Sequence, residues 1–157
     1  MYNFTADDVF RMAEQMECNG AAFYRNAAAG TVDLENRKML LGLAAMEDEH
    51  ERTFADIRSL LTSQEQATTV FDPAGEAAFY LKALVDTKVF FQKTIDTSSL
   101  LEILKEALIA EKDSIVFYLG MKEVVPQRLG KARLDDIIKE EMGHITLIGK
   151  HLKSLRS

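Results

Sequence analysis

An internal repeat is the feature that most constrains how this chain can fold. Four residues recur at one constant spacing of 94 residues: Glu17, Tyr24, Glu47 and His50 return as Glu111, Tyr118, Glu141 and His144. In each half a single glutamate precedes a Glu-x-x-His motif by the same 30 residues. A glutamate three residues before a given histidine arises by chance about one time in ten, so two such motifs at one offset argue against coincidence. The chain is therefore predicted to consist of two similar halves in tandem.

Each half is predicted to form a pair of long helices. Apolar residues recur at alternating steps of three and four, which is typical of a helical stripe that faces a bundle core, and the short alternation typical of strands is missing. We expect helices at residues 5–29, at 33–61, from 99 to the segment 120–126, and at 131–155, with Thr5 and Ser99 as N-caps. The repeated glutamates and histidines lie on these stripes. The fold class is therefore predicted to be all-α, with four long helices.

The segment 62–98 breaks this periodicity and reads as a connector. Asp72 followed by Pro73 is typical of the N-cap and first position of a shorter helix, which we expect to reach about Val85. We expect the third long helix to run in the same direction as the first, and the connector to cross the length of the bundle. Residues 1–157 are expected to form a single domain, with helix pairs at 5–61 and 99–155.

Composition excludes several classes of protein. The formal net charge is −6 and the basic residues are scattered, so we expect neither nucleic acid nor a membrane surface as a partner. No apolar run approaches the roughly 18 to 20 residues that span a bilayer, and the first residues lack the features of a signal peptide, which predicts a cytoplasmic protein. Cys18 is the only cysteine, which excludes internal disulfides and multi-cysteine metal centres. We expect its thiol to be buried and without a role.

The repeated polar residues indicate a metal centre. Residues three apart on a helix share a face, so each Glu-x-x-His can direct one oxygen and one nitrogen at the same point. Four ionised glutamates on inward stripes would be costly to bury without cations. We therefore predict two divalent ions that are held by six side chains: Glu17, Glu47, His50, Glu111, Glu141 and His144. From the spacing alone, the bridging carboxylates are either the Glu-x-x-His glutamates or the two single glutamates.

Other polar residues near these ligands are predicted to support them. Tyr24 and Tyr118 lie two helical turns beyond the single glutamates and on the same face, so each phenol is expected to hydrogen-bond a glutamate across the bundle. Glu51 and Glu140 also lie close to the histidines, but the repeat gives them no acidic counterpart. We assign these two carboxylates to solvent or to positions behind the ligands.

With this ligand pattern, the sequence resembles the rubrerythrin branch of the ferritin-like superfamily. The resemblance covers both helix pairs and is strongest in EKDSIVFY at 111–118 and IKEEMGHI at 138–145. It implies a ferritin-like four-helix bundle with a long crossover, and a site for two iron ions, with manganese or zinc as alternatives, that reacts with hydrogen peroxide or dioxygen. It assigns ligand roles to the six residues named above, makes Glu47 and Glu141 the bridges, and matches Tyr24 and Tyr118 to the family's buried tyrosines.

Two departures from the family pattern bear on function. Full-length rubrerythrins carry a rubredoxin domain with four cysteines, which a chain with only Cys18 cannot have, so electrons are expected from an external donor such as a rubredoxin-type protein. Ser114 stands where rubrerythrins typically have another glutamate. We expect a rubrerythrin-like peroxidase or oxidase that acts in oxidative stress. The alternatives are ferritin-like iron oxidation and storage, or a structural di-metal bundle without turnover; a homodimer is among the open oligomeric states.

Overall fold

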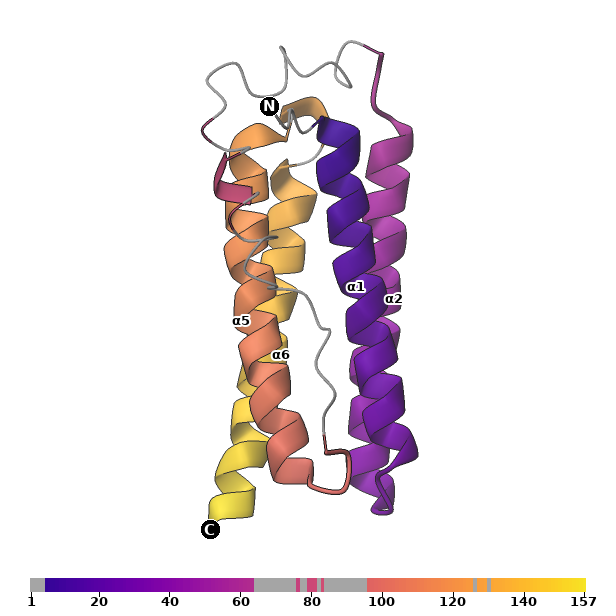
Figure 1. Ribbon diagram of the computed structural model, residues 1–157, viewed down its shortest axis with the longest axis vertical. Coiled ribbons are helices and arrows are strands. Elements are labelled where there is room, and N and C mark those ends of the chain that lie inside the picture. The colour runs from indigo at the N-terminus through magenta and orange to yellow at the C-terminus, as the bar shows by residue number, and fades with distance from the viewer. Residues whose placement is uncertain are drawn as a thin grey trace.

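Four long helices lie side by side in an elongated bundle, as the computed structural model of the chain shows (Figure 1). They are α1 (Ala6–Ala29), α2 (Leu34–Ser59), α5 (Leu100–Val124) and α6 (Lys131–Arg156), with a short 3-10 helix, η1 (Gln127–Leu129), ahead of α6. The structure describes residues 5–63, 76, 79–81, 83, 96–125, 127–129 and 131–157, and no strand occurs among them. The predicted all-α four-helix bundle is confirmed.

The helix boundaries follow local sequence signals. The Thr5 hydroxyl accepts a hydrogen bond from the Asp8 amide at 3.1 Å, and the Asp8 carboxylate accepts one from the Thr5 amide at 2.9 Å, which completes the predicted capping box of α1. The Ser99 hydroxyl accepts from the Glu102 amide at 3.3 Å and caps α5. Helix α5 ends just ahead of Pro126, because the residue before a proline is disfavoured in a helix.

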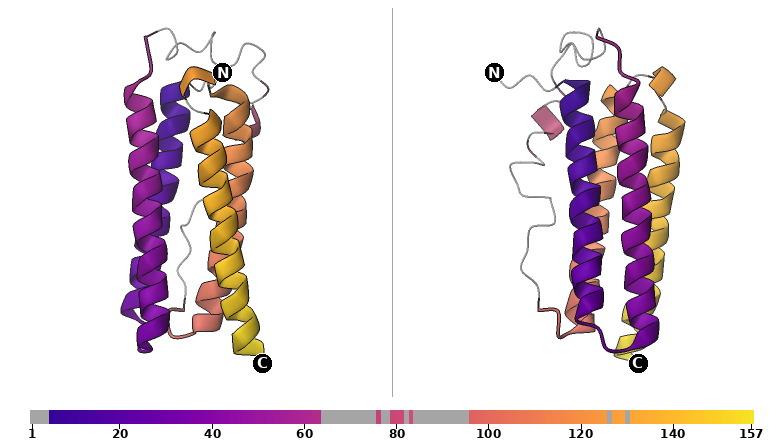
Figure 2. Two further views of the ribbon diagram at one scale, coloured as in Figure 1. Left: turned by 180° about the vertical axis from the view of Figure 1, so that it is seen from behind. Right: turned by 90° about the vertical axis from the view of Figure 1, so that its right-hand side faces the viewer.

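The direction of α5 corrects the sequence-based expectation. The N-terminal end of α1 shares a hydrophobic cluster with the C-terminal ends of α2 and α5, and its C-terminal end shares a second cluster with their N-terminal ends. Helix α5 therefore runs antiparallel to α1 and parallel to α2 (Figure 2). A two-fold axis perpendicular to the helices, rather than along them, relates the two pairs. The C-terminal end of α2 and the N-terminal end of α5 belong to different clusters, so the connector between them crosses the length of the bundle as expected (Figure 1).

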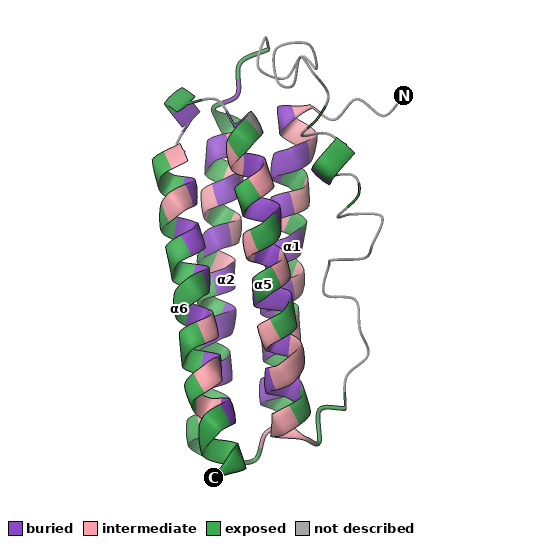
Figure 3. Cartoon of the chain, turned by 90° about the vertical axis from the view of Figure 1, so that its left-hand side faces the viewer, coloured by how far each residue is buried: buried purple, intermediate pink, exposed green. Residues whose placement is uncertain are grey.

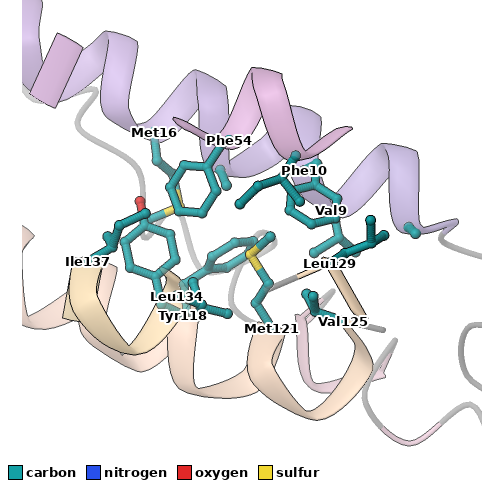
Figure 4. Close-up of a cluster of buried hydrophobic side chains, with 14 of the residues drawn as sticks. Val9, Phe10, Met16, Phe54, Tyr118, Met121, Val125, Leu129, Leu134 and Ile137 are labelled. Atoms are coloured by element: carbon teal, nitrogen blue, oxygen red, sulfur yellow. The ribbon is translucent and has the colours of Figure 1, made fainter. Parts of the chain in front are cut away.

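The two hydrophobic clusters fill the bundle on either side of its middle. The first cluster, drawn in Figure 4, contains the aromatic rings of Phe10, Phe54 and Tyr118. The Phe54 centroid lies 6.5 Å from that of Phe10 and 5.1 Å from that of Tyr118. Residues of the first cluster correspond to residues of the second at the 94-residue offset, as Ala13 does to Ala107. The repeat in the sequence is therefore a repeat in the packing.

Burial follows the predicted stripes, with the buried residues on the inner sides of the helices (Figure 3). Cys18 is an exception to the expectation, because its side chain is exposed. Met16, Glu17 and Gly20 form the buried side of this turn of α1, and at about 100° per residue position 18 falls on the opposite, outer side. None of the described helices has both the length and the apolar composition needed to cross a bilayer.

The connector packs against α5 where it is described. Most of the helix expected at 72–85 lies outside the described residues, and the described ones are helical: 76, 79–81 and 83. Leu81 is buried in the first cluster, and the Tyr80 hydroxyl donates to the Val116 carbonyl at 3.1 Å. Gly120 allows this approach, since a Cβ at that position would overlap the Tyr80 ring.

Candidate metal centre

Six buried acidic and imidazole side chains meet in the middle of the bundle, between the two hydrophobic clusters. All four long helices contribute to them: Glu17 from α1, Glu47 and His50 from α2, Glu111 from α5, and Glu141 and His144 from α6. Each of the six residues is at most 3% exposed. The structure thus brings together every residue that the sequence singled out as a candidate ligand.

The six side chains form two overlapping groups of four. The first group is Glu17, Glu47, His50 and Glu141, and the second is Glu47, Glu111, Glu141 and His144. Within each group one potential ligand atom per residue lies within 4.8 Å of the others. Three carboxylate oxygens and one imidazole nitrogen suit a divalent first-row metal. Glu47 and Glu141 belong to both groups, which is the placement that bridging carboxylates require.

The two histidines have matching surroundings. His50 Nδ1 lies 3.1 Å from a Glu141 oxygen and 3.4 Å from Glu17. His144 Nδ1 lies 3.1 Å from the other Glu141 oxygen and 3.4 Å from Glu111. The imidazole rings stack with their centroids 5.8 Å apart. Each histidine therefore directs Nδ1 toward the shared carboxylates, and the metal-facing side of the cluster keeps the two-fold symmetry of the repeat.

Several atoms at the centre of this cluster lack hydrogen-bond partners among the described residues. His50 Nδ1 and both carboxylate oxygens of Glu141 are buried without one, because their short contacts are not aligned for hydrogen bonds. A buried polar atom left in this state costs about 1–3 kcal/mol. A cation between the carboxylates and the imidazoles would satisfy these atoms, so the residues present fit a metal pair.

Burial and close neighbours shift the pKa values of the cluster. Burial raises the pKa of Glu141 to about 8, and burial together with a neighbouring carboxyl raises the pKa of Glu17 well above its ordinary value. Burial alone would lower the pKa of a histidine, but the surrounding carboxylates outweigh it. They raise the pKa of His144 to about 12 and that of His50 in the same direction. These raised pKa values favour protonated imidazoles among the carboxylates, and a bound metal would compete with those protons.

Two tyrosines connect the halves of the cluster. The Tyr24 hydroxyl donates to Glu111, and the Tyr118 hydroxyl donates to Glu17, so each bond joins α1 to α5. Both hydrogen bonds across the bundle were expected from the sequence. Burial and the adjacent carboxylate raise the pKa of each phenol well above its ordinary value. The phenols therefore stay protonated and hold the single glutamates in position.

Two further residues near the cluster differ in their contacts. Glu140, assigned from the sequence to solvent or to a position behind a ligand, lies 2.7 Å from Nε2 of His50, while its side chain is 54% exposed. Ser114 is buried, but its hydroxyl donates to the Ala110 carbonyl of its own helix at 3.1 Å. The sequence did not single out the contact of Glu140 with His50, and its only signal was the position of Glu140 next to Glu141.

Two antiparallel helix pairs around a buried Glu/His cluster define a ferritin-like bundle with a candidate di-metal site. A solved structure agrees with this fold: a Thermotoga maritima protein described as a ferritin-like diiron-carboxylate protein matches with a TM-score of 0.69 and 23% identity, over 98% of this chain and 97% of that one. At this identity the likeness establishes the fold. No protein-family model and no curated relative matches the sequence. The rubrerythrin branch stays a prediction.

Proposed function

We propose that this protein is a non-haem di-metal carboxylate oxidoreductase of rubrerythrin type, which reduces hydrogen peroxide or dioxygen with electrons from an external donor. The observation that carries the proposal is a pair of buried Glu/His groups that share Glu47 and Glu141. The similar fold of a protein described as a diiron-carboxylate protein favours iron as the metal. Manganese or zinc would also suit the ligands.

The six side chains would divide between two ions. Glu17, Glu47, His50 and Glu141 would hold one, and Glu47, Glu111, Glu141 and His144 the other. Two iron ions at these positions would supply the two electrons that reduce one peroxide to two waters, with uptake of two protons. The carboxylates would compensate changes in metal charge, the two tyrosines would hold the single glutamates, and the apolar clusters on both sides would keep bulk water out of the site.

The source of electrons follows from the cysteine content. A rubredoxin-type iron centre needs four cysteines, and residues 1–157 contain one, Cys18, so no such centre can form within these residues. A separate rubredoxin-type protein is the proposed donor.

The test is metal content and optical spectra of protein from iron-supplied cells, before and after stoichiometric peroxide is added to the reduced form. We expect about two irons per chain and rapid conversion to a ferric spectrum. A Glu141→Ala variant, which lacks a shared carboxylate, should lose the pair of ions. The matched control is Glu49→Gln, which alters a carboxylate of α2 that lies outside the six and is 69% exposed, and which should leave metal content and reactivity unchanged.

Three outcomes would count against the proposal in different ways. Two irons without any reaction with peroxide or dioxygen would contradict the oxidoreductase and leave a structural centre. A large multisubunit particle in light scattering, with iron in excess of two per chain, would favour iron storage. Wild-type protein that binds neither iron, manganese nor zinc would contradict the metal centre itself.

A further inference from the structure

The two halves of the centre match on the side that faces the metal but differ behind the histidines. Glu140 Oε2 lies 2.7 Å from Nε2 of His50. The corresponding Nε2 of His144 is buried and has no hydrogen-bond partner among the described residues. The 94-residue offset assigns Met46 to the place of Glu140 on that side. A thioether is a weak acceptor and carries no charge, so within the described part of the chain His50 has a carboxylate behind it and His144 has none.

This difference matters because of how an imidazole binds a cation. Each histidine directs Nδ1 at the shared carboxylates, so a bound ion leaves the proton on Nε2. On the His50 side, Glu140 can accept that N–H, which fixes the ring orientation and makes the other nitrogen a stronger ligand. On the His144 side, the N–H would stay buried without an acceptor.

We propose that Glu140 is a positioning residue that makes the two metal positions unequal, so that the position containing His50 binds a divalent ion first and more tightly. This inference rests on the proposed di-metal function. Loss of a carboxylate behind a metal-bound histidine typically lowers metal affinity 10–100-fold. Because the Glu140 side chain is 54% exposed, water screens its charge, and we expect the lower end of that range, about tenfold.

The test is a titration of metal-free protein with Mn²⁺, followed by calorimetry and by electron paramagnetic resonance. The wild type should bind two ions in separate steps, with the signal of an isolated Mn²⁺ at one equivalent and that of a coupled pair at two. Glu140→Leu should weaken the first step about tenfold and leave the second unchanged. Glu140→Gln, whose amide oxygen can still accept the N–H, should recover part of the loss.

The repeat offers a matched reciprocal variant. Met46 is 40% exposed, so Met46→Glu places a carboxylate at the equivalent position without disturbing the core. It should strengthen the second step and bring the two constants together. As a check on location, His144→Ala should keep the tight step and His50→Ala should lose it.

The inference is overturned if the wild type binds two ions with equal affinity, or if Glu140→Leu leaves the first constant unchanged. In either case the di-metal centre itself would stand. If instead the wild type fails to bind two ions, the proposed centre is wrong and the inference falls with it. Circular dichroism of each variant separates a lost contact from a lost fold, and the Glu140 and Met46 variants alter only partly exposed side chains.

Discussion

Metal binding to this cluster should release protons in a number that the structure sets. Four of its groups have raised pKa values: His50, His144, Glu17 and Glu141. With a pKa of about 8, Glu141 is about nine-tenths protonated at pH 7. Both imidazoles are charged under the same conditions. Because a carboxylate must lose its proton and an imidazole its second proton to bind a metal, all four are displaced on loading.

Charge balance gives the same number. Four carboxylates and two imidazolium groups leave two negative charges. Glu17 and Glu141 are the carboxyls with raised pKa values, so we expect them to bind the two neutralising protons in the metal-free protein. Two divalent ions in place of the four protons leave the buried cluster neutral again. An uncompensated charge in such a site would be expensive, so both states are expected to be neutral. We therefore expect about four protons released per two ions bound at pH 7.

The release can be measured by calorimetric titration with Mn²⁺ in buffers that differ in ionisation enthalpy. The apparent affinity should also rise with pH, because protons compete with the metal. The control is Glu49→Gln, which removes an exposed carboxylate outside the six and should leave the proton count unchanged. Fewer than about one proton per ion would refute the reasoning, since the metal-free cluster would then not hold protons in place of the metal.

Two further expectations concern stability. Without metal, the free energy of unfolding should fall as pH rises from 5 to 8, because the native state keeps the Glu141 proton up to a pKa of about 8 whereas the unfolded chain releases it near 4.5. Above pH 6.5 His144 adds to this loss, since its pKa is raised in the same way. Each such proton contributes about 1.4 kcal/mol per pH unit. Urea unfolding in chelator tests this, and a rise with pH would contradict it. Gly149→Ala should raise the free energy of unfolding by about 1 kcal/mol, because a Cβ there meets nothing within 4 Å. Gly120→Ala should lower it, because its Cβ would overlap the Tyr80 ring. Equal effects of the two variants in thermal unfolding would count against the packing of Tyr80 on Gly120.

Local geometry explains why so much of the fold and site could be predicted from the sequence. The capping box at Thr5 and Asp8 depends on residues three apart, and so does the pairing of Glu47 with His50. The helical period then assigns the other candidate ligands to inward stripes, where the structure finds them. These features need only a helix and its phase, which the sequence contains.

Features that depend on how helices are placed relative to one another could not be predicted. A repeat with one offset is compatible with a two-fold axis along the bundle or across it, so the repeat alone could not fix the direction of α5. Only the expected crossing of the connector indicated it, because a connector that leaves α2 beside the start of α1 and crosses the bundle must begin α5 at the opposite end. The contact of Glu140 with His50 joins α6 to α2 and depends on the spacing of those helices. Cys18 is a different case: the helical phase, with Met16, Glu17 and Gly20 inward, already placed it on the outer side of α1, and the prediction of burial followed the apolar character of the thiol instead.

The arrangement of polar groups around the centre also bears on where an oxidant could bind. Each group of four offers one imidazole and three carboxylates, two of them shared with the other group. Ser114, where rubrerythrins typically have another glutamate, uses its hydroxyl within α5, and its repeat counterpart Gly20 has no side chain. Neither adds a ligand, so first-row ions that accept up to six ligands would keep coordination positions free for peroxide or dioxygen. Ser114→Glu would place a carboxylate at this position. We expect the variant to keep two bound ions but to react more slowly with peroxide, as stopped-flow measurements of the reduced protein would show. An unchanged rate would contradict an approach of the oxidant from the Ser114 side.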